Sequence, residues 1–205
     1  MTGRTDDVAL AQEGGRLTIT LARPDKANAM TEEMLVALRD AVRGADAQVL
    51  VLTGAGSVFS GGADLPAARA GLARSPLWGE VTTALAEFPG LSVAAINGSC
   101  AGGAVGMAIA CDLRVAIPTA RFFYPVLRLG FPPQPSDVVR LGRLLGPART
   151  KLILLGAEEI GAEEALRIGL VDKIAENLDQ AVQALCASAL AADPAHLAAI
   201  KQQIL

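Results

Sequence analysis

Two glycine-rich segments carry the residues of this sequence that could do chemistry. "FSGGADL" spans residues 59–65 and "INGSCAGGAVG" spans residues 96–106, and each follows an apolar run. A glycine-rich turn that leads into a helix leaves backbone N–H groups without intrahelical partners. Two such donors aimed at one oxygen form an oxyanion hole, which polarises a thioester carbonyl and stabilises the enolate made from it. The segments therefore indicate a pair of main-chain amide donors.

A dinucleotide site is one alternative for the earlier segment. Gly54-Ala55-Gly56 follows an apolar strand pattern, as the G-x-G-x-x-G fingerprint requires. However, Phe59 stands where the third glycine belongs, and "GSVFSGGADL" is too rich in Gly and Ser to form the helix that would receive a pyrophosphate. The pattern therefore disfavours dinucleotide binding.

A nucleophile elbow is a second alternative, for the later segment. Gly98-Ser99-Cys100-Ala101-Gly102 has the G-x-nucleophile-x-G spacing between a strand pattern and a helix pattern. Cys100 would be the nucleophile, and His196 follows it in the expected chain order. A cysteine here is more typically a small buried residue, and His196 in "DPAHLAAIK" fits the solvated first turn of a helix. A thiol hydrolase stays open as an alternative.

The composition limits the classes of partner. The chain has 205 residues, of which 52% are hydrophobic and 3% aromatic, so its core must be aliphatic and alanine-rich. The net charge of −3, with scattered Lys and Arg, argues against a nucleic-acid surface, which needs a concentrated basic field.

The reactive residue types indicate the compartment and the cofactors. Cys100, Cys111 and Cys186 show no CxxC spacing, which suits a reducing cytosol. With one histidine and no His/Cys cluster we expect no metal site. The polar start "MTGRTDDVAL" does not resemble a signal peptide, and no apolar run reaches membrane-spanning length. We therefore expect a cytoplasmic protein with no membrane contact.

Strand patterns alternate with helix patterns along the chain. "RLTITL" alternates apolar and polar residues, whereas "VLVLT" at 49–53 is continuously apolar, which is typical of a strand covered on both faces. Thr31 stands before a helical apolar pattern as an N-cap should. Further strands are expected at 91–97, 113–117, 121–124 and 170–174, and helices at 78–88, 102–112, 136–145, 147–155, 161–169 and 178–205. This alternation predicts an α/β fold.

The ordered motifs resemble those of a known family. The sequence is similar to the crotonase superfamily, the enoyl-CoA hydratase/isomerase family, in "GGRLTITLARPDKANAM", "VLVLTGAGSVFSGGADL", "INGSCAGGAVGMAIACDLRVA" and "ILLGAEEIGAEEALRIGLVDKI". The resemblance implies an α/β crotonase fold of repeated β-β-α units, with two roughly perpendicular sheets and C-terminal helices. We expect one domain over residues 1–205, with a core at 8–175 and a shortened helical region at 176–205. A homotrimer or a dimer of trimers is also implied.

The resemblance assigns a ligand and two donors. It implies an acyl-CoA thioester as the ligand, with CoA part of the substrate and no separate cofactor. The family's oxyanion donors fall on the backbone N–H groups of Ala63 and Gly103. The residues beside these donors are expected to contact the substrate, and they are Gly62, Asp64, Leu65 and Gly102. "RPDKANA" matches the loop that wraps along the CoA, so Lys26, Ala27 and Ala29 are candidate contacts.

The sequence departs from the family where hydratases carry their two catalytic glutamates. One position is Gly106 and the other is Val126, and neither residue can move a proton. We therefore expect isomerase, decarboxylase or C–C lyase chemistry rather than hydration. A binding or assembly subunit without catalysis is the alternative.

An acid or base that replaces the glutamates is harder to identify from the sequence. Asp137 opens the helix after "GFPPQPS", a region that borders the acyl pocket in the family, and is our candidate for the acid or base. An acid in the first turn of a helix also suits the helix dipole, which would be a purely structural role. Tyr124 precedes Pro125 and is expected to pack in the core, because neighbouring residues of a strand point to opposite faces.

Overall fold

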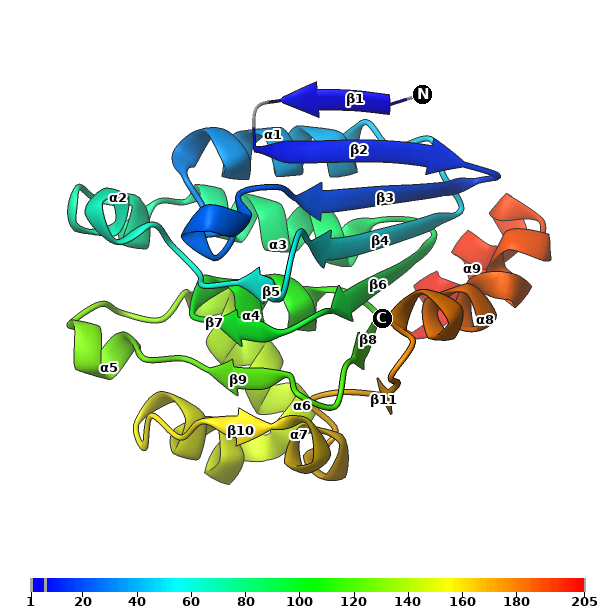
Figure 1. The fold of residues 1–205 in the computed structure, drawn as a ribbon. Coiled ribbons are helices and arrows are strands. Elements are labelled where there is room, and N and C mark those ends of the chain that lie inside the picture. The colour runs from blue at the N-terminus through cyan, green and yellow to red at the C-terminus, as the bar shows by residue number, and fades with distance from the viewer. Residues whose placement is uncertain (1, 6, 205) are drawn as a thin grey trace.

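The computed structural model describes residues 2–5 and 7–204, which form two sheets and surrounding helices (Figure 1). The large sheet contains β1 (Thr2–Thr5), β2 (Val8–Glu13), β3 (Arg16–Leu21), β4 (Val49–Gly54), β6 (Leu91–Ile96), β8 (Leu113–Ala116) and β11 (Lys173–Ile174), in that spatial order. The small sheet contains β5 (Val58–Ser60), β7 (Ser99–Ala101), β9 (Arg121–Phe123) and β10 (Ile160–Gly161), in the order β10-β9-β7-β5.

Helices follow the strands. They are α1 (Glu32–Arg43), α2 (Leu65–Arg69), α3 (Leu77–Glu87), α4 (Gly103–Ala110), α5 (Val126–Leu129), α6 (Pro135–Leu154), α7 (Ala162–Ile168), α8 (Leu178–Ala191) and α9 (Pro194–Ile204), with short 3-10 turns η1 (Pro24–Lys26) and η2 (Leu72–Arg74). In the described part of the chain, none of them is both long enough and apolar enough to cross a membrane.

The order of elements repeats along the chain. A strand of the large sheet is followed by a short strand of the small sheet and then by a helix, as in β4-β5-α2, β6-β7-α4 and β8-β9-α5. The central strands β3, β4, β6 and β8 pair in parallel. The expected α/β fold with two sheets is therefore confirmed.

The large sheet is covered on both faces, as the apolar run at 49–53 predicts. In β4, Leu50 and Leu52 point into the main core beneath α1 and α3, whereas Val49 and Val51 join a second cluster with α8. This alternation is the two-residue period of a strand. Figure 1 shows α1 and α3 on one side of the sheet and α8 on the other.

Helix ends lie where the sequence signals indicate. The Thr31 side chain accepts a hydrogen bond from the Met34 amide, and Gly169 closes α7 with φ +81°. Gly146, with φ +77° and ψ 166°, breaks the helical path of α6 just before Pro147. These local signals act independently of the tertiary structure, so they could be read from the sequence.

Asn28 ties the 24–29 loop to β5. Its buried side chain donates to the carbonyls of Ala55 and Val58, at 2.9 and 2.7 Å, and accepts from the Arg23 amide at 2.9 Å. Its backbone carbonyl accepts from the Ser60 hydroxyl at 2.8 Å. The left-handed φ of +51° suits asparagine better than most residues. The Asn28 side chain therefore fixes this loop against the segment that leads into the first glycine-rich turn.

We predict that Asn28→Ala lowers the free energy of unfolding by about 3 kcal/mol, because three partly buried backbone groups each lose a hydrogen bond to this side chain. Asn28→Gly should cost about 1 kcal/mol less, since glycine accepts the positive φ. Urea denaturation measures both values. Gln12→Ala, which removes one exposed side-chain hydrogen bond, is the control and should change stability by less than about 0.5 kcal/mol. Equal losses for Asn28→Ala and Gln12→Ala would contradict the prediction.

Candidate active site

The small sheet brings the two glycine-rich segments together. β5 and β7 are parallel, and Val58 pairs with Ser99 while Ser60 pairs with Cys100. Because parallel strands end at the same edge, the turns that follow them are neighbours. At Gly62, where φ is +86°, an added Cβ would lie 2.7 Å from the Ala101 carbonyl oxygen. A side chain does not fit at Gly62, and bare backbone there allows the two turns to touch.

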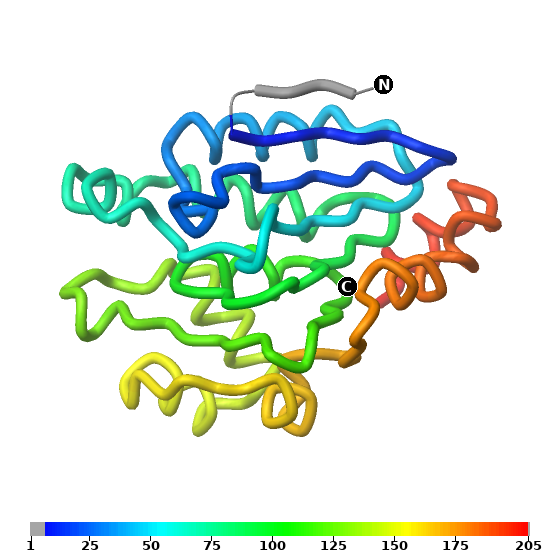
Figure 2. Tube along the Cα trace, viewed as in Figure 1, coloured from blue at the N-terminus to red at the C-terminus, as the bar shows by residue number. Residues whose placement is uncertain are grey.

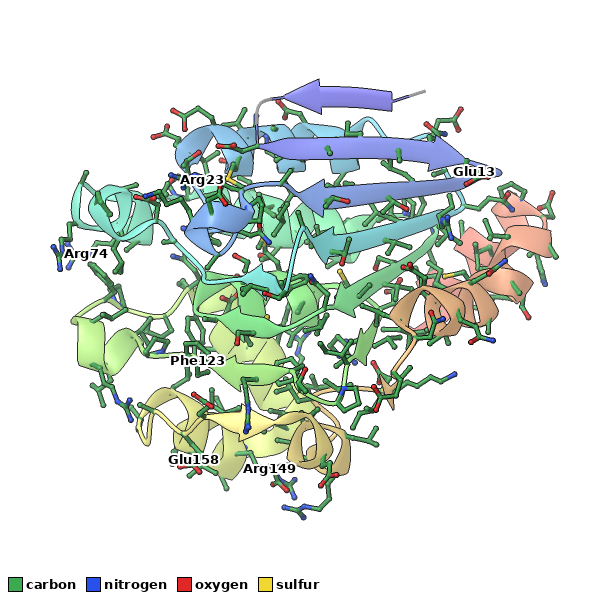
Figure 3. All side chains as sticks on the ribbon, in the orientation of Figure 1. Glu13, Arg23, Arg74, Phe123, Arg149 and Glu158 are labelled. Carbon is green, nitrogen blue, oxygen red and sulfur yellow. The ribbon has the colours of Figure 1, made fainter. Side chains whose placement is uncertain are left out.

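β9 extends the same arrangement by one strand. It runs parallel to β7, with Cys100 paired to Phe122, and the Gly102 amide donates to the Phe123 carbonyl at 3.0 Å. The chain after β9 therefore arrives at the same edge, where Tyr124 follows. Phe123 at the end of β9 is labelled in Figure 3.

A cavity of about 70 Å³ lies at this edge. Its lining comes from both turns, from the segment after β9 and from nearby helices, and consists of Gly61, Ala63, Leu65, Ala68, Ala73, Trp78, Gly102, Gly103, Tyr124, Pro125, Val126, Leu129, Phe131, Pro132 and Gln134. A second, mainly apolar cavity of about 430 Å³ shares Val126 and Phe131 with it. The two cavities are therefore adjacent.

Ala63 and Gly103 both line the first cavity. Gly103 is the first residue of α4, so its N–H has no partner within the helix. The backbone of Met30 bonds to the Gly62 carbonyl and the Asp64 amide on either side of Ala63. Among the described residues, no acceptor is found for the amide of Ala63 or of Gly103.

One aromatic and one amide side chain, those of Trp78 and Gln134, are held in place in the cavity wall. The Trp78 ring packs against Gly103, where an added Cβ would come within 2.5 Å of it, and its indole N–H donates to the Leu72 carbonyl. The Gln134 side-chain amide donates to the Ala73 carbonyl at 2.8 Å. Both residues were missed from the sequence, because no local pattern shows which helix packs against the turn.

The expected CoA loop lies beside the first turn but not in the cavity wall. Lys26 and Ala27 are exposed and Ala29 is half-buried, and the Gly61 amide donates to the Ala27 carbonyl at 2.8 Å. The loop is therefore in contact with a residue that lines the cavity. The roles of Lys26, Ala27 and Ala29 toward CoA stay predictions.

Asp64 is occupied by structural contacts. Its carboxylate accepts from Arg23 at 3.0 Å and from the Ala67 amide at 3.4 Å, which caps α2. The hydrogen bond from Arg23, labelled in Figure 3, holds the pKa of Asp64 below its usual value. Of the substrate contacts expected beside the donors, Leu65 and Gly102 line the cavity, whereas Gly62 and Asp64 support the turn behind it.

Tyr124 and Asp137 form a buried pair behind the cavity wall. Tyr124 is 2% exposed and belongs to the core, as expected, but it also lines the cavity, which the sequence did not indicate. Its hydroxyl donates to Oδ2 of Asp137 at 2.8 Å, and the backbone amide of Gln134 donates to the oxygen of the same hydroxyl at 3.4 Å. Asp137 itself is 1% exposed and lies outside the lining.

The environment of Asp137 changes its protonation. Burial raises the pKa of the Asp137 carboxyl from 3.8 to about 6, although the hydrogen bond from Tyr124 and the charge of Arg140 act in the opposite direction. Burial also raises the pKa of Tyr124 far above its usual value. Such a shifted acid beside a cavity is a feature of functional sites.

Gly106 leaves the space that the Asp137 carboxylate occupies. An added Cβ at Gly106 would overlap all three carboxyl atoms of Asp137. Position 106 is where the resemblance predicts a glutamate, so a carboxylate from α6 lies where a side chain from α4 would begin. Val126, at the other glutamate position, lines both cavities with an apolar side chain.

The elements that carry Cys100 and His196 lie in different parts of the molecule. Cys100 is fully buried in β7, and burial raises the pKa of its thiol. His196 is exposed on the first turn of α9. In Figure 2, α9 lies at the right of the view, opposite α2 and α5, which line the cavity. This arrangement weighs against a Cys100–His196 hydrolase.

In the ranges 2–5 and 7–204, no group of three or more His, Cys, Asp and Glu side chains is arranged to hold a metal ion.

Comparisons with known proteins point to one family. Residues 11–205 match the family described as enoyl-CoA hydratase/isomerase. A probable enoyl-CoA hydratase of Mycobacterium bovis is 34% identical over 199 residues, which are 96% of this chain and 79% of that protein. A short-chain-enoyl-CoA hydratase of Clostridium acetobutylicum is 36% identical over 182 residues, which are 83% of this chain and 69% of that protein. The structure of Pseudomonas aeruginosa DspI superimposes with a TM-score of 0.88 at 34% identity, covering 98% of this chain and 86% of that one.

We predict that Asp137→Asn stabilises the protein increasingly as pH rises. A carboxyl whose pKa is raised by folding binds its proton more tightly in the folded state, so its contribution is full below about pH 4 and is lost through about pH 6. The shift from 3.8 to about 6 corresponds to a loss on the order of 2–3 kcal/mol by pH 7, which the variant avoids. Urea denaturation at pH 4 to 7 measures the difference.

Asp179→Asn, in the exposed first turn of α8, is the matched control for this experiment and should show no comparable trend. A stability difference between Asp137→Asn and the native chain that stays constant over this pH range would contradict the prediction.

Proposed function

Because the chain belongs to the enoyl-CoA hydratase/isomerase family, we propose that it binds an acyl-CoA thioester and stabilises the enolate of that thioester with the amides of Ala63 and Gly103. The observation that carries the proposal is that two residues lining one cavity both have a backbone amide with no acceptor among the described residues. The large apolar cavity next to it has room for an acyl chain. CoA enters as part of the substrate, and no further cofactor is required.

The two amides act on the thioester oxygen. Removal of a proton from the α-carbon moves charge onto that oxygen, and fixed N–H donors stabilise the charge without reorganising. Removal of one such donor from an enzyme typically costs about 2.7–4 kcal/mol of transition-state stabilisation. Gly103 also stands at the positive end of the α4 dipole, which favours a negative oxygen.

The reaction that we propose is enolate chemistry rather than hydration. Gly106 and Val126 occupy the positions where the resemblance places the water-activating glutamates. Isomerisation, decarboxylation or C–C cleavage needs the enolate but not an activated water. Such a chain would assemble as a trimer or a dimer of trimers, as the resemblance implies.

The second candidate function is acyl-CoA binding without catalysis, or an assembly role. Glycine and valine at the two glutamate positions favour it, and the amide donors would serve binding equally well. Exchange of the α-protons of a bound acyl-CoA with solvent distinguishes an enzyme from such a subunit.

We predict that the protein binds hexanoyl-CoA about 10-fold more tightly than S-hexyl-CoA, the thioether that lacks only the carbonyl oxygen. Two hydrogen bonds of about 0.5–1.5 kcal/mol each account for the difference. Trp78 is the single tryptophan and lines the cavity, so its fluorescence reports binding. Free CoA is the control for contacts outside the cavity. Equal affinity for the two ligands would contradict the oxyanion hole.

We also predict that crotonyl-CoA bound to the protein does not add water, since no glutamate is present at position 106 or 126. The enoyl absorbance measures the addition, and a hydratase with both glutamates is the positive control. In parallel, hexanoyl-CoA in D₂O should take up deuterium at its α-carbon. Rapid loss of the enoyl absorbance would contradict the proposed reaction class.

A further inference from the structure

The cavity offers one side chain that can move a proton. Among its described lining residues, Tyr124 is the one with a titratable side chain. The other polar side chains of the lining are Trp78 and Gln134, whose N–H groups already donate to the carbonyls of Leu72 and Ala73. Proton transfer at the α-carbon therefore has one candidate in the cavity wall.

The Tyr124 hydroxyl is held in one orientation. It donates its proton to Oδ2 of Asp137 at 2.8 Å, and the Gln134 amide donates to its oxygen at 3.4 Å. The Ser136 hydroxyl contacts the other carboxyl oxygen of Asp137 at 3.3 Å. Both carboxyl oxygens are therefore engaged, and the phenol of a residue that lines the cavity is held by the buried Asp137 and the half-buried Gln134.

The position of Asp137 depends on the missing side chain at Gly106. Any Cβ at that position would overlap the carboxyl group, so α4 must present glycine for α6 to place its aspartate there. A helix-interior glycine costs about 1 kcal/mol relative to alanine. The arrangement therefore carries two costs in stability: a glycine inside α4 and a buried carboxyl group on α6.

We propose that Tyr124 is the catalytic acid/base residue of this site and that Asp137 is its positioning residue and proton acceptor, in the space that Gly106 leaves open. The inference rests on the proposed function, because it requires a thioester whose enolate oxygen is held by Ala63 and Gly103. It goes beyond that function by assigning the proton transfer to a phenol–carboxylate pair, with the phenol directly after β9 and the carboxylate on α6.

The proton transfer balances as a relay. The Cα–H bond breaks, its electron pair forms the enolate, and the proton moves to Oη of Tyr124. The phenolic proton moves at the same time to Oδ2 of Asp137, so no free tyrosinate forms. Reversal of both steps returns a proton to the enolate, either at the α-carbon or at a conjugated carbon. The pair is restored without a water molecule or a second base.

The pH dependence follows from the groups around Asp137. The groups that act on its charge are Tyr124 after β9 and Arg140 and Ser136 of α6. No charged group of α3 or α4 is found to do so among the described residues. Because the carboxyl must be ionised to accept the proton and its pKa is about 6, exchange should rise with pH through that value.

The test measures deuterium uptake at the α-carbon of hexanoyl-CoA by the full chain in D₂O, with Trp78 fluorescence as the separate readout of binding. Tyr124→Phe and Asp137→Asn should each lower the exchange rate at least 100-fold, while the Kd changes less than about threefold. In the native chain the rate should rise through about pH 6, and in Asp137→Asn this rise should be absent.

Two further variants provide an independent test of the relay and a control. Gly106→Ala leaves Tyr124 and Asp137 in the sequence but displaces the carboxylate, so exchange should fall at least 10-fold with binding retained. This variant also covers the case in which Tyr124→Phe does not fold. Asp179→Asn, a first-turn aspartate on the exposed side of α8, is the control and should exchange at the native rate.

The outcomes separate the two proposals. Native exchange in Tyr124→Phe, or a persisting rise near pH 6 in Asp137→Asn, would overturn the relay. Binding of hexanoyl-CoA by the native chain without any α-exchange would also overturn the relay, but not the assignment of the ligand. Absence of binding for every acyl-CoA tried would instead refute the proposed function itself.

Discussion

The parallel pairing of β5, β7 and β9 is the constraint on which the rest of the candidate site depends. Because parallel strands end at a common edge, the residues that follow them meet there although they are far apart in sequence. One strand leads to Ala63, the next to Gly103 and the third to Tyr124. Each of the three strands is only three residues long, so their positions depend on the large sheet and on side chains such as Asn28.

Glycine has three different roles at this edge. At Gly62 a positive φ and a close approach to the Ala101 carbonyl exclude any side chain. At Gly103 the bare backbone lets the Trp78 ring close the wall beside a free amide. At Gly106 the missing side chain leaves room for a carboxyl group from another helix. These glycines look alike in the sequence, but each of them is required for a different physical reason.

The Tyr124–Asp137 pair shows how a functional site can oppose stability. A carboxyl group buried beside a phenol is costly to ionise, and burial raises its pKa despite the hydrogen bonds that it accepts. Such a cost persists in a fold only where the surrounding core is large enough to offset it. Here Tyr124 belongs to one contiguous cluster of buried hydrophobic residues that reaches from Val8 to Val171.

The sequence by itself determined the α/β class, the buried strand at 49–53, the cap at Thr31, the stop at Gly169 and the family. These depend on local periodicity, capping and ordered motifs, which need no distant partner. It also indicated that Gly106 and Val126 cannot move protons, because that is a property of the residue types alone.

Only the tertiary structure decided what surrounds those positions. The strands β5, β7 and β10 are too short to have a pattern of their own and exist because of their partners. The sequence places Tyr124 in the core and offers Asp137 as a candidate acid or base, but it gives no sign that the two are in contact. Their hydrogen bond joins two elements whose packing no local pattern encodes. Side chains meet across elements through the packing of the whole chain, so the identity of a neighbour is a property of the fold.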